Sequence, residues 1–280
     1  MGHGQRLPSN VLDGEACAVP RWPHGVDDVD LAACAVTVRL VALALKATAP
    51  QQLGRFWTQA LGWNARETDG ADVVLVPTDP TSFDVLGRPG AGDKIGQNRI
   101  HLDLTTTSLD DHTKTVAKLL SIGARHVDIG QDPTHVVLVD LEGNEFCIIE
   151  PGNRFLAGCP RLGAVNCDGT HALGCFWSEA LGWPLVWDHE EETAIQAPGG
   201  RGPKITWSGT PLMPVWGDER FHIHVAPTPG TNTQDARDHL VALGATTSTH
   251  GHGCPRSVAL ADVDGNTFCL VEPEDDDISG

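Results

Sequence analysis

Residues 56–63 read Phe-Trp-Thr-Gln-Ala-Leu-Gly-Trp, and residues 176–183 read Phe-Trp-Ser-Glu-Ala-Leu-Gly-Trp, so 6 of 8 positions are identical. A second match lies further along the chain, where residues 140–151 and residues 262–273 agree at 7 of 12 positions. The two matches are spaced by 120 and 122 residues. Because the spacing hardly changes, the chain is predicted to contain two collinear copies of one unit.

The repeat divides the 280 residues into two predicted domains, residues 36–152 (repeat one) and residues 160–273 (repeat two). Residues 153–159 form the linker between them. Residues 1–35 have no counterpart in repeat two and are predicted to be an N-terminal extension. Residues 274–280 have none either and form an acidic tail. Two domains agree with the usual size of about 150 residues per domain.

Each repeat divides again into two units that read strand, helix, then further strands. Residues 36–46 are predicted to be a strand. Residues 50–61 are predicted to be a helix, with Gly62 as its C-cap, because one helical stripe is apolar: Leu53, Phe56, Trp57, Ala60 and Leu61. A second unit begins with a strand at 99–104 and a helix at 108–123. The pattern recurs in repeat two, so the prediction is an α+β chain of four βαβββ units.

The composition excludes several classes of partner. Acidic residues outnumber basic ones by 37 to 19, giving a formal charge of −18, which argues against nucleic acid or an anionic membrane as the main partner. The apolar run at 31–45 is short and contains Arg39, so no membrane span is predicted. We find no secretory signal pattern. Eight cysteines are too few for a disulfide scaffold, and reduced thiols in a cytoplasmic protein are predicted.

The sequence combines four such units with three motifs. These motifs are the Phe-Trp-x-x-Ala-Leu-Gly-Trp helix, a His-x-Asp or His-x-His strand and an Asp-x-x-Gly-Asn-x-Phe-Cys ending. In its units and motifs the sequence resembles the vicinal oxygen chelate superfamily. This superfamily includes glyoxalase I, bleomycin-resistance proteins and extradiol dioxygenases. The resemblance covers about residues 36–273 and is closest to actinobacterial proteins with tandem glyoxalase-like domains. It implies two tandem glyoxalase-like domains, in which paired units form curved mixed sheets around small-molecule cavities. It also implies that the first and last strands of a unit are neighbours.

Candidate site residues follow from strand alternation combined with this resemblance, because metal-dependent members of the superfamily hold the ion with His and carboxylate groups on the concave face. His101 and Asp103 share one face of their strand, since successive residues point to opposite faces. In the last strand of that unit, Phe146 and Glu150 share a face. The resemblance implies that His101 lies beside Glu150.

Repeat two offers a richer set of the same kind. His222 and His224 share a face, and the resemblance implies that Glu272 lies beside them. Two His and one carboxylate suit a divalent metal such as Fe, Mn, Ni or Zn. The resemblance also implies a further ligand on the first strand of the partner half, near Ala42 or Leu162. Neither residue type binds metal, so the inherited site is incomplete in both copies.

Other residues are candidates for catalysis or for ligand binding. Without a metal, Glu272 or Glu150 is a candidate general base. Candidate ligand-binding residues supply charged or aromatic side chains near the cavities: Arg99, Asp103, Arg220, Phe146, Phe268, Trp183 and Trp207.

Each of these patterns also has a structural interpretation. A His beside a Glu is equally well a hydrogen-bonded buried pair. Arg99 and Arg220 are candidates for ion pairing with carboxylates of the chain rather than with a ligand. Residues 250–254 read His-Gly-His-Gly-Cys, which looks like a metal-binding tract, yet repeat one carries no such tract and the position favours a solvated loop.

Two functions therefore stay open, and the sequence does not decide between an enzyme and a binding protein. The first is a binding protein for an aromatic or cationic metabolite, of the bleomycin-resistance type, with a degenerate metal site. The second is a metal-dependent lyase, isomerase or dioxygenase that uses His222, His224 and Glu272. In either case one repeat can keep the site while the other becomes a scaffold. Both a monomer and a homodimer fit the tandem arrangement.

Overall fold

The computed structural model describes residues 36–68, 70–80, 82–128, 135–214, 219–248, 254 and 256–272. These residues form two eight-stranded mixed sheets and four helices, an α+β fold in which neither sheet closes into a barrel. The predicted four βαβββ units are confirmed. The N-terminal extension and the acidic tail lie outside the described residues. No helix among the described residues is long and apolar enough to cross a membrane.

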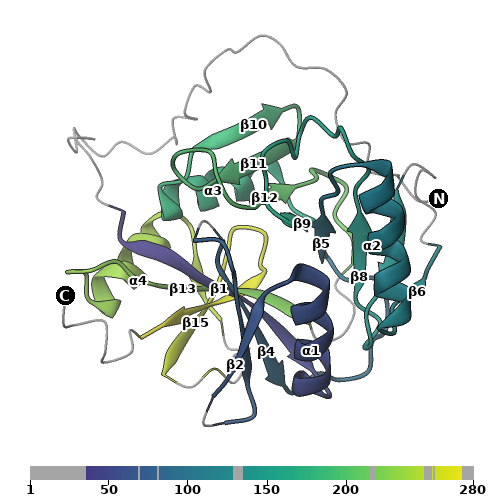
Figure 1. The fold of residues 1–280 in the computed structure, drawn as a ribbon. Coiled ribbons are helices and arrows are strands. Elements are labelled where there is room, and N and C mark those ends of the chain that lie inside the picture. The colour runs from purple at the N-terminus through teal and green to yellow at the C-terminus, as the bar shows by residue number, and fades with distance from the viewer. Residues whose placement is uncertain are drawn as a thin grey trace.

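The first sheet, called sheet A, combines the first half of repeat one with the second half of repeat two (Figure 1). In spatial order its strands are β14 (Thr246–Thr247), β15 (Ser257–Ala261), β16 (Thr267–Val271), β13 (Phe221–Pro227), β1 (Val38–Ala47), β4 (Asp84–Pro89), β3 (Val73–Val76) and β2 (Asn64–Glu67). Its units carry the helices α1 (Pro50–Leu61) and α4 (Thr233–Ala242).

The second sheet, called sheet B, combines the first half of repeat two with the second half of repeat one. In spatial order its strands are β10 (Leu185–His189), β11 (Glu192–Gln196), β12 (Lys204–Trp207), β9 (Leu162–Cys167), β5 (Ile100–Leu104), β8 (Glu145–Ile148), β7 (Val136–Val139) and β6 (Arg125–His126). Its units carry α2 (Leu109–Ser121) and α3 (His171–Leu181).

Each sheet is held together by one strand pairing between the repeats. In sheet A, β1 pairs antiparallel with β13, from Val38 opposite Pro227 to Leu45 opposite Phe221. Figure 1 shows the purple β1 beside the green β13 at the centre of the sheet. In sheet B, β5 pairs antiparallel with β9. Within each unit the first and last strands are parallel neighbours, as the family resemblance implies.

The helices pack through the predicted apolar stripe. In α1, the stripe residues Leu53, Phe56, Trp57, Ala60 and Leu61 are all buried. Gly62 ends the helix with a φ of 73°, a left-handed conformation that glycine adopts at little cost. The same stripe in α3 is buried as well.

One core lies between the two sheets and is closed by aromatic contacts from one sheet to the other. The ring of Trp57, on α1, packs edge-on against Phe146 of β8, with centroids 5.0 Å apart. Trp177, on α3, makes the equivalent contact with Phe268 of β16, also at 5.0 Å. Since α1 packs on sheet A and β8 belongs to sheet B, these rings join the sheets through their helix-covered faces.

The Asp-x-x-Gly-Asn turns clamp one sheet to the helix of the other. The Asp140 carboxylate accepts the backbone N–H groups of Glu142 and Asn144 and the indole N–H of Trp57. Glu142 then accepts the backbone N–H groups of Thr48 and Ala49, at the N-terminus of α1. In repeat two, Asp264 accepts the N–H of Thr170, the N-cap of α3. Both turns therefore supply an anion to a helix N-terminus, where it stabilises the helix dipole.

Each of these helices approaches its sheet most closely at a glycine. A Cβ on Gly174 of α3 would lie 2.6 Å from the Cβ of Thr193 on β11. A Cβ on the matching Gly54 of α1 would lie 2.8 Å from a methyl carbon of Val73 on β3. Because the Cβ of Thr193 is fixed by its backbone, it cannot rotate away, and the contact at Gly174 is the stricter of the two.

We predict that Gly174→Ala lowers the free energy of unfolding by about 1–3 kcal/mol, since overpacking outweighs the gain of about 1 kcal/mol in helix propensity. Chemical denaturation followed by tryptophan fluorescence measures this. Gly92→Ala is the control, because a Cβ there meets nothing within 4 Å. An unfolding free energy for Gly174→Ala equal to that of the control would contradict the close contact.

We predict that Glu142→Ala lowers the free energy of unfolding by about 2–4 kcal/mol. The change removes the acceptor of two backbone N–H groups and leaves the buried guanidinium of Arg220 without the carboxylate that lies 3.1 Å from it. Lys114→Ala serves as the control, since its ion pair with Asp110 is exposed to solvent. If both variants unfold at the same denaturant concentration, Glu142 does not clamp the sheets.

Candidate functional site

The outer face of sheet A, which is turned away from the shared core, carries a pair of imidazoles. Along β13, Phe221, Ile223 and Val225 join the core. Because side chains alternate along a strand, His222 and His224 share the outer face, as predicted. Both are buried, and their Nε2 atoms are 2.9 Å apart.

Two cysteines complete this cluster. Cys269 of β16 is in register with His224, so its side chain lies on the same face. Cys254, which precedes β15, places its Sγ atom 3.3 Å from the Nε2 atom of His224 and 3.7 Å from that of His222. The two Sγ atoms are 3.1 Å apart. All four donor atoms lie within 4.8 Å of one another, and we call this set the His2Cys2 cluster.

The spacing of these donors fits a tetrahedral ion. Zn–N bonds of about 2.0 Å and Zn–S bonds of about 2.3 Å place tetrahedral ligand atoms about 3.3–3.8 Å apart. Four of the six separations are 2.9–3.7 Å, close to those edges, and the separations of the Cys269 sulfur from the two imidazoles lie within 4.8 Å. Two imidazoles and two cysteines are also the ligand types that zinc prefers.

The thiols of the cluster differ in acidity. The hydrogen bond from the Cys269 thiol, together with those from the two imidazoles, holds the pKa of Cys254 well below its usual range. The same contact, together with burial, raises the pKa of Cys269. Cys254 is therefore the more acidic thiol of the pair, and the thiolate is the form that binds metal.

The strand beside the imidazoles carries small residues. On β1, Ala42 lies opposite His224 and Ala44 lies opposite His222. Ala42 is also in register with Asp84 on β4, so Asp84 lies on the same face, two strands or about 9–10 Å from His224. Burial raises the pKa of Asp84, and the charge of Arg66 partly opposes this shift. Asp84 is too distant to belong to the His2Cys2 cluster.

Sheet B has a related but different set on its outer face. Asp103 is in register with Cys147, and His101 lies 3.4 Å from Asp103, measured from Nε2 to Oδ1. The three side chains are buried and their donor atoms lie within 4.8 Å of one another. Burial raises the pKa of Asp103, and the nearby His101 opposes that shift.

The linker between the repeats covers this face of sheet B. Leu156 packs with Cys147 and Ala164 in a separate apolar cluster, and Phe155 and Cys159 pack against the same cluster. The chain's own residues therefore occupy the position that, in sheet A, lies over the His2Cys2 cluster.

Neither predicted His–Glu pair is formed. Glu150 accepts a hydrogen bond from His135 instead, at 2.8 Å. Glu272 pairs with Arg256 in an exposed ion pair. The physical reason is the register of the last strand in each unit. On the outer faces, Cys147 and Cys269 are the residues in register with the strands that carry the histidines. The two Glu residues lie beyond the ends of β8 and β16.

The predicted aromatic ligand contacts belong to the core. Phe146, Phe268 and Trp207 are buried between the sheets, and Trp183 packs against the edge of that core. Their positions on the strands and after α3 turn them away from the outer faces. Phe268 and Trp207 nevertheless line the cavity beside Arg99 and Arg220, whereas Phe146 and Trp183 are not part of its lining.

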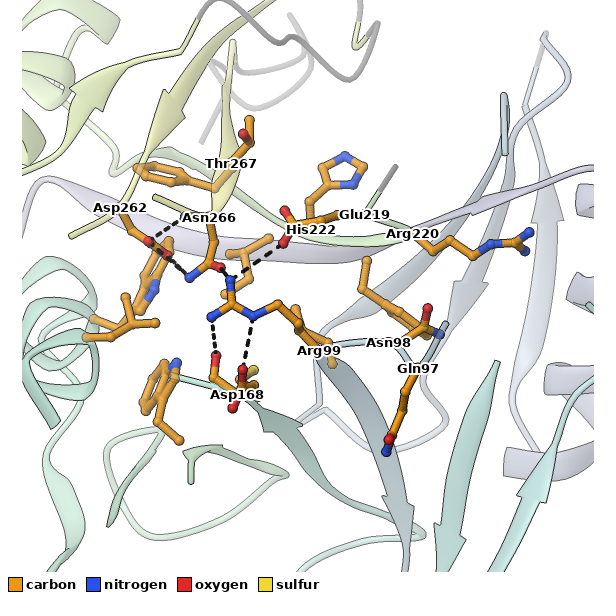
Figure 2. Close-up of a pocket in the computed structure, with 18 residues that line it drawn as sticks. Gln97, Asn98, Arg99, Asp168, Glu219, Arg220, His222, Asp262, Asn266 and Thr267 are labelled. Carbon is orange, nitrogen blue, oxygen red and sulfur yellow. Dashed lines mark hydrogen bonds and ion pairs between the residues drawn. The ribbon is translucent and has the colours of Figure 1, made fainter. Parts of the chain in front are cut away.

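The predicted arginines lie where the two sheets meet (Figure 2). Arg99 pairs with Asp168 at 3.1 Å and donates to Asn266 at 2.7 Å, and Arg220 pairs with Glu142. Burial raises the pKa of Glu219, which the charge of Arg99 opposes. The cavity beside these groups measures about 50 Å³. This volume is far below the roughly 300–1,000 Å³ of sites for larger organic ligands.

The sequence pattern missed both cysteines of the cluster. Cys269 belongs to the Phe-Cys pair that both repeats share, and strand alternation places it on the face opposite Phe268. Cys254 ends the tract interpreted as a solvated loop. The structure instead places its sulfur in the cluster, while residues 249–253 lie outside the described residues.

Comparisons with known proteins agree with this fold. A family model described as "Glyoxalase-like domain" matches residues 42–149 and again residues 164–271. Glyoxalase I from Zea mays is 17% identical, with a TM-score of 0.59 over 84% of this chain and 92% of that one. A putative dioxygenase from Bacillus subtilis subsp. subtilis str. 168 is 13% identical, with a TM-score of 0.57 over 84% and 85% of the two chains. No curated protein was found to match. At these identities the solved structures show a shared fold.

Proposed function

Because the chain belongs to the family of proteins with glyoxalase-like domains, we propose that it binds a divalent metal ion of the zinc type at the outer face of sheet A. The observation that carries the proposal is the convergence of four donor atoms within 4.8 Å: His222 Nε2, His224 Nε2, Cys254 Sγ and Cys269 Sγ. Without an ion these groups hydrogen-bond one another, and a metal ion at their centre would replace the protons that they share.

The usual ligand arrangement of the superfamily does not fit this chain. It draws ligands from the first strands of both paired units, and on β1 the residue opposite His224 is Ala42. All four donors of the His2Cys2 cluster come from the second half of repeat two. The proposed site is therefore held by one βαβββ unit, with β13 and β16 as its rigid base.

Soft thiolate donors favour zinc over the harder Mn²⁺ and Mg²⁺. Four protein donors complete a tetrahedral set, which is typical of structural zinc sites rather than of catalytic sites with an open position. When an open position exists, such an ion polarises a bound oxygen as a Lewis acid. The residues of this chain would hold the ion, and the burial of His222, His224 and Cys269 would limit the access of water to it.

Metal-free binding of a small cationic or neutral molecule is the second candidate. Two observations favour it: the formal charge of −18, and the buried Asp84 carboxyl group, which shares the outer face with the imidazoles. In this case the His2Cys2 cluster would act as a polar patch that donates and accepts hydrogen bonds.

We predict about one equivalent of zinc per chain in protein purified without chelator, measured by elemental analysis. The His222→Ala/His224→Ala and Cys254→Ser/Cys269→Ser double variants should each lose it, because two of four ligands are removed. Glu272→Gln is the matched control and should keep full metal content, since its partner is the exposed Arg256.

Cobalt gives a second readout that does not depend on the metal present during expression. Co²⁺ added to metal-free protein should produce a thiolate-to-cobalt absorption band, and this band should be absent in the double cysteine variant. Protein that carries no metal and binds neither Zn²⁺ nor Co²⁺ would refute the metal site. A screen of small cationic and neutral ligands against the same protein would then test the second candidate.

A further inference from the structure

A second group of reactive side chains lies on the surface of repeat two, on α3 and β10. The Sγ atom of Cys175 is 3.6 Å from Nδ1 of His171. The other ring nitrogen of His171, Nε2, is 2.8 Å from a carboxylate oxygen of Asp188. Thiol, imidazole and carboxylate thus form a chain of hydrogen bonds in the order that nucleophile, base and orienting group take in hydrolases and thiol enzymes.

The local structure holds these groups in place. His171 and Cys175 are four residues apart on α3, so their side chains lie on the same face, one turn apart. The start of the helix is fixed, because the Thr170 hydroxyl accepts the N–H of Leu173. Asp188 comes from β10, on the other side of the imidazole. Cys175 and His171 are half-buried, so reagents in solution can reach the sulfur.

The fold does not require these three residues. With the offset of 120 residues that aligns the two Phe-Trp helices, the matching positions in repeat one are Gln51, Arg55 and Thr68. The helix of repeat one forms and packs with the same apolar stripe without a thiol, an imidazole or a carboxylate at these places. The triad is therefore a property of repeat two alone, rather than a requirement of the βαβββ unit.

We propose that Cys175 is a nucleophilic thiol, activated by His171 and Asp188, which forms mixed disulfides with small neutral or cationic disulfides. The Nε2–H group of His171 donates to Asp188, which leaves Nδ1 as the acceptor of the thiol proton. Asp188 then stabilises the imidazolium, and the sulfur becomes a thiolate. The three residues belong to a unit of sheet B, whereas the proposed metal ligands belong to sheet A, and this proposal does not rest on the metal site.

The reaction balances without any further oxidant. The Cys175 thiolate attacks one sulfur of the incoming disulfide, a new S–S bond forms, and the original S–S bond breaks. The released thiolate leaves with the bonding electron pair and takes the proton held on His171. Cys175 is oxidised to the mixed disulfide while the other half of the reagent is reduced to a thiol.

The charge around the triad selects the reagent. Glu179 lies one turn beyond Cys175 on the same face of α3, and Glu190 and Glu191 follow Asp188 at the end of β10. All three of these glutamates are exposed. A cationic reagent is therefore concentrated near the sulfur and an anionic one is repelled, an effect that salt screens.

The first test measures the alkylation rate of each cysteine in the full chain with iodoacetamide at pH 7, resolved by peptide mass spectrometry. Cys175 should react faster than Cys159, the other half-buried cysteine that lies outside the His2Cys2 cluster. His171→Gln, which copies Gln51 of repeat one, should slow Cys175 by about tenfold or more. Asp188→Asn should slow it in the same direction. Cys159, which is also half-buried, should keep its rate in both variants and serves as the internal control.

The second test compares two methanethiosulfonate reagents of the same size, one carrying trimethylammonium and one carrying sulfonate. The measured quantity is the normalised ratio: the rate of the cationic reagent over that of the anionic reagent at Cys175, divided by the same ratio for a free small thiol. It should be about ten at about 10 mM salt and should approach one at about 500 mM. Glu179→Gln/Glu191→Gln should lower it. An unchanged rate in His171→Gln would overturn the activation, and a normalised ratio of one at low salt would overturn the charge selection.

Discussion

The antiparallel pairing of β1 with β13 is the interaction on which the rest of the structure depends. It joins a strand from each repeat along seven registered residue pairs, and the pairing of β5 with β9 does the same in sheet B. Neither repeat keeps a sheet of its own. As a result, the turn of one sheet reaches the helix of the other, and Glu142 can cap α1 only because the two sheets lie helix-side to helix-side. The faces that carry the polar clusters are left pointing outward.

Much of this fold could be predicted from the sequence, because helical periodicity and the repeat are local signals. The stripe from Leu53 to Leu61, the C-cap at Gly62 and the restart of each unit all follow from spacing. The exchange of halves between repeats could not be predicted in the same way. The alternation of apolar residues along β1 fits a pairing with β5 as well as one with β13, so the sequence pattern alone does not distinguish the two.

Of the four residues of the candidate site, only the two histidines could be predicted from the sequence. His222 and His224 follow from strand alternation alone, which needs no knowledge of neighbours. Their partners depend on the parallel register with β16, and a sequence does not show where two separate strands align. The predicted Glu272 lies three residues beyond the position in register with His224, which Cys269 occupies. Cys254 comes from a segment without periodicity, so only its proximity in the tertiary structure marks it as part of the cluster.

The linker that packs on sheet B restricts which substitutions the outer face of that sheet can accept. Leu156 and Phe155 make one outer face part of the protein's own hydrophobic packing, so substitutions there must preserve shape and apolar character. The outer face of sheet A is under no such demand from the linker, and its residues are free to change in chemistry. The path of the connecting segment therefore gives the two sheets different roles: the outer face of sheet B takes part in hydrophobic packing, and the outer face of sheet A is available for chemistry.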